Sequence, residues 1–278
     1  MTDQARSFEG GVAGASCEGC PSFRAGGLAR LGVEVGASKY LVALAGNPNT
    51  GKSTVFNSLT GLRQHTGNWP GKTVVRAEGG FSFDGERYKL VDLPGTYSLL
   101  ATSPDEEVAR DFLLFGQPDV TVVVVDATRL ERNLNLVLQI LEITSRVVVC
   151  LNLMDQARRL GLEVDARRLA KDLGVPVIAA AARYREGLEE LLSAVRDVAS
   201  GRTVCRGYRV ARHSAELEKA VVEVSGQLLR VYPGLPNARW VALRLLEGDH
   251  RVIEAVRTGE LGRLAVMGGE PVGVEGGV

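Results

Sequence analysis

The stretch Gly46-Asn47-Pro48-Asn49-Thr50-Gly51-Lys52-Ser53 decides the fold of this chain. It matches the pattern G-x-x-x-x-G-K-[ST], in which a glycine-rich loop wraps phosphate groups. The apolar run at 40–45 before it predicts a buried strand, and residues 54–60 after it predict a helix. A phosphate-binding P-loop connects a strand to a helix in this way, so the flanks agree with the motif. A glycine-rich turn without a ligand is the alternative interpretation.

Each residue type in the P-loop has a chemical reason. Gly46 and Gly51 let the backbone turn tightly, so that its N–H groups surround a polyanion. The positive end of the following helix dipole adds to the attraction. We expect Lys52 to reach the outer phosphates and the Ser53 hydroxyl to bind magnesium. The residues expected to contact the nucleotide here are Asn47, Pro48, Asn49, Thr50, Gly51, Lys52, Ser53 and Thr54.

Composition narrows the classes of function. The 278 residues are 45% hydrophobic, enough for one main domain and a smaller one. Lys plus Arg number 33 and Asp plus Glu number 33, so the chain has no net positive charge to attract nucleic acid. We therefore expect no nucleic-acid partner. No uncharged apolar run approaches the ~20 residues that span a bilayer, which predicts a soluble chain.

The first 38 residues predict a flexible, glycine-rich tail whose one feature is Cys17-Glu18-Gly19-Cys20. Two thiolates can bind zinc or iron, but a structural zinc site needs four ligands and no second pair follows. A reduced, mobile pair is favoured, and a bridge to another subunit stays open. The few, scattered cysteines indicate a reducing compartment.

Residues 62–73 predict a long loop beside the phosphate site, because they are rich in Gly, Pro and Asn. We expect this loop to be a switch that the terminal phosphate orders. Thr73 is the better candidate of its two threonines for the magnesium shell. A β-branched residue that merely opens the strand at 74–76 is the alternative. Trp69 and His65 are expected to pack or to lie at the loop tip rather than to act in catalysis.

Asp92-Leu93-Pro94-Gly95 is the second chemical motif. The Asp84-Gly85 turn predicts a hairpin between strands at 81–83 and 88–91, which brings Asp92 to a strand end. In P-loop enzymes a carboxylate here holds magnesium through water, and a glycine N–H, here of Gly95, senses the terminal phosphate. A helix is expected to follow from Ser103 to Phe115.

The third motif is Asn152-Leu153-Met154-Asp155, which ends a predicted buried strand. The Asp155 carboxylate can accept from the ring N–H and the amino group of guanine, a donor pair that adenine lacks. Asn152 can tie the base-binding loop to the P-loop. Met154, Ala181 and Ala182 complete the expected base contacts. A helix cap is the alternative for an N-x-x-D sequence in isolation.

Strands at 120–125, 147–151 and 176–179 alternate with helices at 132–143, 165–173 and 187–198. This alternation predicts an α/β fold of the P-loop NTPase (Ras-like) type, a mostly parallel sheet with helices on both faces, and ligands at the carboxyl ends of its strands. Helical periodicity beyond Gly201 predicts a small all-α domain. The expected domains are a tail at 1–38, a GTPase (G) domain at 39–200, a helical domain at 201–266 and a linker at 267–278.

Taken in order, the P-loop, Thr73, Asp92–Gly95 and Asn152–Asp155 resemble a small GTPase domain. Together with Gly67-Asn68-Trp69-Pro70-Gly71-Lys72-Thr73-Val74 and the segment at 239–249, they resemble the cytoplasmic N-terminal region of the ferrous iron transport protein B family over residues 39–257. The cysteine-bearing tail lies outside the resemblance.

The resemblance implies a slow GTPase that uses GTP, releases GDP and needs Mg²⁺. It also implies stimulation by K⁺ held near the phosphates by Asn49, so that Lys52, Asn49, Thr73 and Gly95 carry catalysis. It further implies a membrane permease domain in the same full-length protein, and a place on the cytoplasmic face of the inner membrane. Control of Fe(II) uptake through that permease is the implied function. A homo-oligomer stays open.

Two departures from GTPase motifs qualify the resemblance. Leu153 replaces the usual lysine of the guanine motif, which the family shares, and the 181–186 loop lacks the usual serine and one glycine, so nucleotide affinity or release is expected to be unusual. Thr96 stands where Ras-like proteins place a water-orienting glutamine.

A soluble regulatory GTPase of ribosome assembly or tRNA modification is the alternative function, and a P-loop scaffold without turnover is a third.

Overall fold

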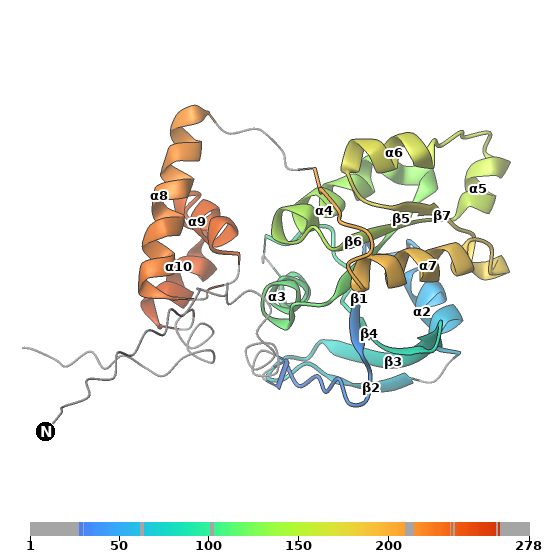
Figure 1. The fold of residues 1–278 in the computed structure, drawn as a ribbon, viewed down its shortest axis with the longest axis horizontal. Coiled ribbons are helices and arrows are strands. Elements are labelled where there is room, and N and C mark those ends of the chain that lie inside the picture. The colour runs from blue at the N-terminus through green and yellow to red at the C-terminus, as the bar shows by residue number, and fades with distance from the viewer. Residues whose placement is uncertain are drawn as a thin grey trace, which may run out of the picture.

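The computed structural model describes residues 28–261 apart from residues 30, 62–63, 101–102, 209–213, 234, 236 and 260. Figure 1 shows a sheet with helices around it and a separate lobe of helices at its side. Cys17 and Cys20 lie outside the described residues. The domain boundaries expected from the sequence stay predictions.

The sheet has seven strands in the order β2-β3-β4-β1-β5-β6-β7. Strands β4, β1, β5, β6 and β7 pair in parallel, and β3 pairs antiparallel with both β4 and the edge strand β2. The strands are β1 (Tyr40–Gly46), β2 (Gln64–Asn68), β3 (Val75–Phe83), β4 (Glu86–Asp92), β5 (Val120–Asp126), β6 (Val147–Asn152) and β7 (Val177–Ala179). This is the mostly parallel sheet that the sequence predicts.

Two buried clusters cover the two faces of the sheet, which confirms the predicted layers. Alternate residues of β1 point to opposite faces, as a strand requires. Leu41 and Ala43 pack in the cluster that contains α3 (Pro104–Asp111) and α4 (Leu130–Ile143). Val42 and Leu44 pack in the cluster that contains α2 (Lys52–Thr60) and α7 (Leu188–Ala199).

The remaining helices of this part are short. The π-helical turn η1 (Phe112–Gly116) ends the expected helix at 103–115, and the turn η2 (Ala127–Arg129) precedes α4. Beyond β6 come α5 (Met154–Arg159), α6 (Ala166–Leu173) and the turn η3 (Ala182–Tyr184). The sequence pattern did not predict α5, because its six residues are too few to show helical periodicity.

The long loop expected at 62–73 is wrong in part. Gln64–Asn68 forms the edge strand β2 and pairs with β3 in the register Thr66↔Ala77. Its residues, QHTGN, have no apolar alternation that would predict a strand. Backbone pairing with β3 therefore decides the structure here, and side-chain pattern does not.

Residues 28–29 and 31–38 also differ from the flexible tail expected at 1–38. Leu28 and Val33 are buried, and the Val33 N–H donates to the Leu28 carbonyl at 2.9 Å. Both side chains join the cluster that contains α3. This part of the tail is therefore packed on the sheet domain.

The helical lobe contains α8 (Ala215–Val231), α9 (Ala238–Leu246) and α10 (His250–Arg257). Val221 and Leu228 of α8 and Trp240 of α9 are buried between its helices, as their spacing predicts. Arg244 of α9 joins this lobe to α4, since its Nη2 lies 3.2 Å from Oε2 of Glu142. Among the described residues, no helix is long and apolar enough to cross a membrane.

Candidate functional site

The P-loop connects β1 to α2, and its glycines are required by close packing. A Cβ atom at Gly46 would lie 2.6 Å from the Val124 carbonyl oxygen. At Gly51, where φ is +81°, it would lie 2.4 Å from Nδ2 of Asn152. Gly51 begins α2 without a side-chain cap, so the first N–H groups of the helix remain for another acceptor.

Lys52 and Asp92 form an ion pair at the end of β4. Their Nζ and Oδ1 atoms are 2.5 Å apart, and the two side chains are 11% and 17% exposed. Burial raises the pKa of Asp92, and the lysine charge counteracts part of this rise. The sequence placed both residues at one site but did not predict that they pair with each other.

The segment that follows Asp92 lies along the P-loop. The Thr96 N–H donates to the Gly46 carbonyl at 3.3 Å, and a Cβ at Gly95 would lie 3.5 Å from the Pro48 backbone. Gly95 is thus next to the P-loop, as its expected phosphate-sensing role requires. Thr96 is buried.

Asn152 connects two loops that are far apart in the sequence. Its Nδ2 donates to the Thr50 carbonyl at 2.9 Å, and its Oδ1 accepts from the Ala182 N–H at 3.0 Å. The side chain is 1% exposed. The expected tie between the P-loop and the Ala181–Ala182 loop is therefore present.

Asp155 follows Met154 at the start of α5, where Leu153 adopts a left-handed backbone with φ of +62°. The Asp155 side chain is 17% exposed, and its Oδ2 lies 3.9 Å from Arg159 Nη2. The Met154 N–H donates to the Ala180 carbonyl at 3.1 Å, which joins this turn to the Ala181–Ala182 loop. Asp155 thus keeps a carboxylate at the surface of this edge.

The sequence analysis missed an ion pair that joins α5 to the loop after Ala182. Arg158 donates through both terminal nitrogens to the two carboxylate oxygens of Glu186, the Nη1–Oε2 distance being 3.1 Å. These hydrogen bonds lower the pKa of Glu186. Only the opposite charges of two distant polar segments signalled this pair in the sequence.

Thr73 is not brought into contact with the other expected magnesium ligands. It is exposed in a turn that closes when the Trp69 N–H donates to the Val74 carbonyl at 3.0 Å. Within the described part of the chain, no hydrogen bond joins its side chain to Ser53 or Asp92. Trp69 itself is buried against Phe112, which confirms its packing role.

The residues present fit a nucleotide and a magnesium ion. Asn47 is 3% exposed, and its Nδ2 has no partner among the described residues although it lies in the P-loop. Unsatisfied buried donors are rare in proteins and indicate an acceptor not yet in place. Ser53 and Asp92 offer the oxygen donors that magnesium prefers.

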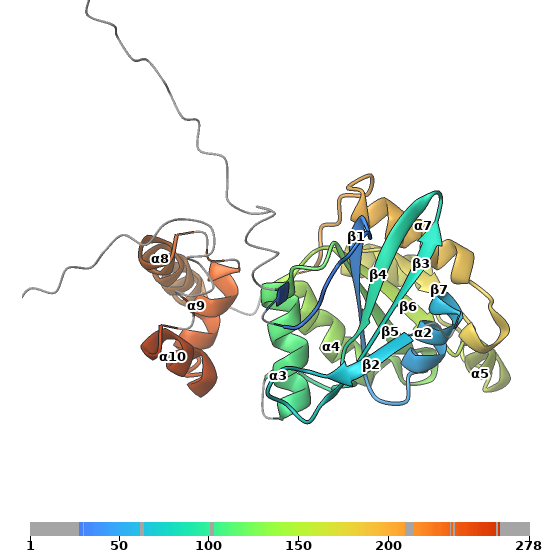
Figure 2. The same cartoon turned by 90° about the horizontal axis from the view of Figure 1, so that it is seen from below.

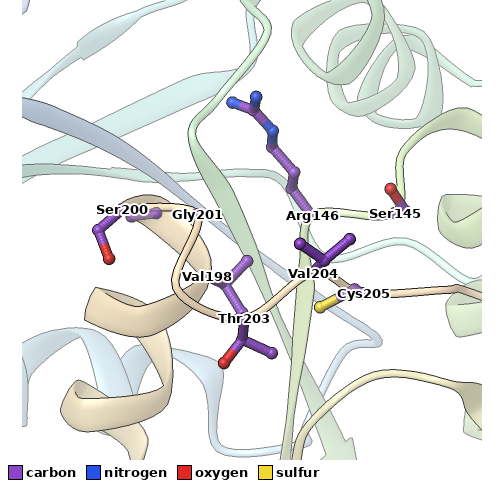
Figure 3. A pocket seen from close by; sticks show the side chains of 9 residues that line it. Ser145, Arg146, Val198, Ser200, Gly201, Thr203, Val204 and Cys205 are labelled. Carbon is purple, nitrogen blue, oxygen red and sulfur yellow. The ribbon is translucent and has the colours of Figure 1, made fainter.

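A cavity of about 300 Å³ lies at the opposite edge of the sheet from the P-loop. It is lined by residues before β6, at the end of α7 and just after α7: Ser145, Arg146, Val198, Ala199, Ser200, Gly201, Thr203, Val204 and Cys205. Figure 3 shows the Arg146 side chain pointing away from the others. Burial raises the pKa of the Cys205 thiol, so it has little thiolate to react. This cavity contains none of the predicted site residues.

Comparison with known proteins gives the family. Residues 40–195 match the model described as Ferrous iron transport protein B, and residues 213–266 match the FeoB cytosolic helical domain. The Fe(2+) transporter FeoB of Escherichia coli (strain K12) is 39% identical over 218 residues, which are 76% of this chain and 27% of that protein. That of Salmonella typhimurium is 40% identical over 225 residues, with the same shares. The chain thus spans 27% of the length of these relatives.

Solved structures agree over both parts of the chain. The cytosolic domain of the T. maritima FeoB iron transporter in GDP form I has a TM-score of 0.72 at 37% identity, covering 81% of this chain and 91% of that one. The cytosolic domain of L. pneumophila FeoB has a TM-score of 0.71 at 34% identity, covering 81% and 88%. With a family match over residues 40–195, more than half of its length, this chain belongs to the ferrous iron transport protein B family.

Proposed function

We propose that this chain binds GTP at the P-loop edge of its sheet and hydrolyses it to GDP and phosphate. The observation that carries the proposal is the Asn152 bridge, in which one side chain bonds both the P-loop and the Ala181–Ala182 loop. The relative from T. maritima has been solved in a GDP form, which supports a guanine nucleotide.

The phosphates would be held by the P-loop backbone and Lys52. For this the lysine must leave Asp92, 2.5 Å away, and take a phosphate oxygen in its place. The partly buried Lys52 ammonium keeps a negative partner during this exchange, because a phosphate oxygen replaces the Asp92 carboxylate. Asp92 would then be free to hold magnesium through water, and the Ser53 hydroxyl would bind the ion directly. Magnesium neutralises charge on the phosphates.

Thr73 would complete the magnesium shell after a movement of its turn. The register of β3 supports this role, since Ala77 pairs with Asp92 and the preceding turn therefore lies at the same edge as the P-loop. Gly95, next to Pro48, would donate its N–H to the terminal phosphate. The loop at 69–74 would thus act as the switch that distinguishes GTP from GDP.

Guanine would be recognised by Asp155, with Met154, Ala181 and Ala182 beside the base. The Asp155 carboxylate accepts two hydrogen bonds from guanine, and adenine offers no such pair. Asn152 positions this loop against the P-loop and does not need to touch the base. Arg159 of the same helix lies beside this carboxylate, with its Nη2 3.9 Å from Asp155 Oδ2.

Potassium stimulation belongs to the same proposal. Asn49 is exposed at the P-loop tip with φ of +66°, so its side chain is accessible to a cation near the phosphates. A cation there supplies charge that other GTPases take from an arginine. With Thr96 in place of a water-orienting glutamine, we expect slow turnover.

We further propose that GTP hydrolysis controls Fe(II) passage through a membrane permease in a longer protein, at the cytoplasmic face of the membrane. The curated relatives are Fe(2+) transporters of which this chain spans 27%. The match over residues 40–195 and 213–266 favours this role over ribosome assembly or tRNA modification. A homo-oligomer is part of the proposal, and sedimentation of the chain tests it.

Steady-state hydrolysis of GTP and ATP with Mg²⁺, in KCl and in NaCl at equal ionic strength, tests the activity. We expect GTP-selective turnover that K⁺ raises about tenfold or more, as charge at the transition state requires. Asn49→Ala should lose the stimulation, whereas Asn135→Ala, an exposed asparagine on α4, should keep it. Equal rates in both salts contradict the cation role, and GTP binding without turnover favours a scaffold.

A further inference from the structure

The segment at 28–36, excluding residue 30, lies against the turn that carries Thr73; we call it the strap. Leu28 and Val33 are buried in the cluster that also contains Trp69 and Phe112. A Cβ at Gly116 in η1 would lie 3.4 Å from Leu28 Cδ2. Figure 2 shows this dark blue segment beside α3, just before the chain enters β1. The strap precedes the family match, which begins at residue 40.

Arg76 at the start of β3 connects the strap to the turn. Its Nη1 donates to the Leu31 carbonyl at 2.8 Å, and its Nε lies 2.8 Å from the Glu78 carboxylate. Its guanidinium lies 5.5 Å from the ring centroid of Trp69, a cation–π contact. One side chain thus touches the strap, the turn and the sheet.

Gly32 is the point of closest approach between the strap and the turn. A Cβ there would lie 2.6 Å from Arg76 Nη1 and 3.0 Å from Pro70 Cγ. Its φ of +67° is also a backbone conformation that other residues adopt at a cost. A side chain at position 32 would therefore displace the Arg76 guanidinium and press against the Pro70 ring.

The turn that carries Thr73 also makes contacts with η1 and α3. Trp69 packs edge-on against Phe112 with ring centroids 5.6 Å apart, and Lys72 Nζ lies 2.5 Å from Glu107 of α3. However, the buried Trp69 ring N–H has no partner among the described residues. An unsatisfied buried donor is unfavourable, so the packed position of Trp69 depends on the contacts that its neighbours make.

We propose that the strap is an autoinhibitory clamp, which holds the Thr73 turn in its exposed, packed position through Gly32, Leu31 and Arg76. Thr73 must leave this position to reach the magnesium site. The strap therefore opposes closure of the Thr73 turn over bound GTP, and it does not oppose GDP binding. A ligand shifts such an equilibrium only by its differential affinity for the two positions. The GTP part of this inference rests on the proposed function; the clamp itself does not.

Gly32→Ala tests the clamp, with Gly36→Ala as its matched control. Both glycines are in the strap region with left-handed φ, +67° and +58°, but a Cβ at Gly36 meets nothing within 4 Å. The two variants therefore share the backbone cost, and only Gly32→Ala pushes Arg76 and Pro70. Arg76→Gln is the second variant, because it removes the hydrogen bond to Leu31 without adding bulk.

The first measurement is amide hydrogen exchange of the 64–74 peptide without nucleotide, in the full chain, alongside thermal melting. Gly32→Ala and Arg76→Gln should exchange about tenfold faster at Trp69 and Lys72, whose N–H groups close the turn, and Gly36→Ala should match the parent. Equal exchange in Gly32→Ala and Gly36→Ala, with Arg76→Gln unchanged, overturns the clamp.

The second measurement is the affinity for a non-hydrolysable GTP analogue and for GDP. The clamp predicts that Gly32→Ala and Arg76→Gln bind the analogue several-fold more tightly while GDP binding stays within twofold. Faster exchange with unchanged analogue affinity overturns the autoinhibitory role. A parent chain that binds neither nucleotide refutes the proposed function instead, and the exchange measurement alone then decides the clamp.

Discussion

Replacing Asn152 by alanine removes the bridge on which the candidate site depends. The Thr50 carbonyl loses the donor at 2.9 Å, and the Ala182 N–H loses the acceptor at 3.0 Å. Because Asn152 is 1% exposed, water does not readily take either place. Two buried backbone groups are then left unsatisfied, one in the P-loop and one in the base-binding loop.

The expected loss of stability follows from these two groups. Each buried group left without its partner costs about 1–3 kcal/mol, so Asn152→Ala should lower the free energy of unfolding by about 2–6 kcal/mol. Asn133 offers a matched control on α4. It is 3% exposed, donates to the Arg129 carbonyl at 2.8 Å and accepts from the Asp126 N–H at 3.5 Å. The longer second bond predicts a loss in the lower half of the same range.

Urea unfolding without nucleotide and GDP titration on the same preparations measure both effects. Asn152→Ala should lose stability and also bind GDP at least tenfold more weakly, because the loops at either end of the bridge separate. Asn133→Ala should lose stability but bind GDP within about threefold of the parent. A loss below about 0.5 kcal/mol in Asn152→Ala, or equal weakening of GDP binding in both variants, refutes the bridge.

Three further outcomes follow from the geometry. Gly51→Ala, whose Cβ would lie 2.4 Å from Asn152 Nδ2, should abolish GDP binding, while Gly61→Ala, with φ of +61° and open space, should keep it and cost only about 1–2 kcal/mol in urea. Burial raises the folded-state pKa of Asp92, so folding disfavours its ionised form. This group therefore adds stability below its unfolded pKa and loses that contribution as the pH rises through the folded pKa. Asp92→Asn should flatten this part of the pH dependence in an acid unfolding series. Burial raises the pKa of Cys150 to about 12, so this thiol should stay unreactive toward a thiol reagent at pH 8 until urea unfolds the chain; labelling in the native state contradicts the burial.

Motifs with a fixed local shape were predictable from the sequence. The P-loop, the strand end at Asp92 and the strand end at Asn152 depend on neighbours in the chain, and parallel strands bring such ends to one edge. The α/β fold and its helical lobe also followed from periodicity.

Features that depend on distant partners were not predictable. β2 forms because β3 offers backbone groups, and nothing in QHTGN indicates a strand. The strap is glycine-rich in sequence, yet Leu28 and Val33 find a buried surface on α3 and η1. Lys52 pairs with Asp92, and Thr73 lies exposed, because contacts among side chains depend on the whole packing and not on motif spacing.

Calorimetric titration of the chain with GDP and with ADP, in the presence of Mg²⁺, tests the central claim most directly. The account predicts GDP binding at least a hundredfold tighter than ADP binding, about 2.7 kcal/mol, because only guanine donates twice to the Asp155 carboxylate. Asp155→Ala should remove most of this preference and leave the fold intact. Equal affinities for GDP and ADP, or a preference that survives in Asp155→Ala, would contradict the account.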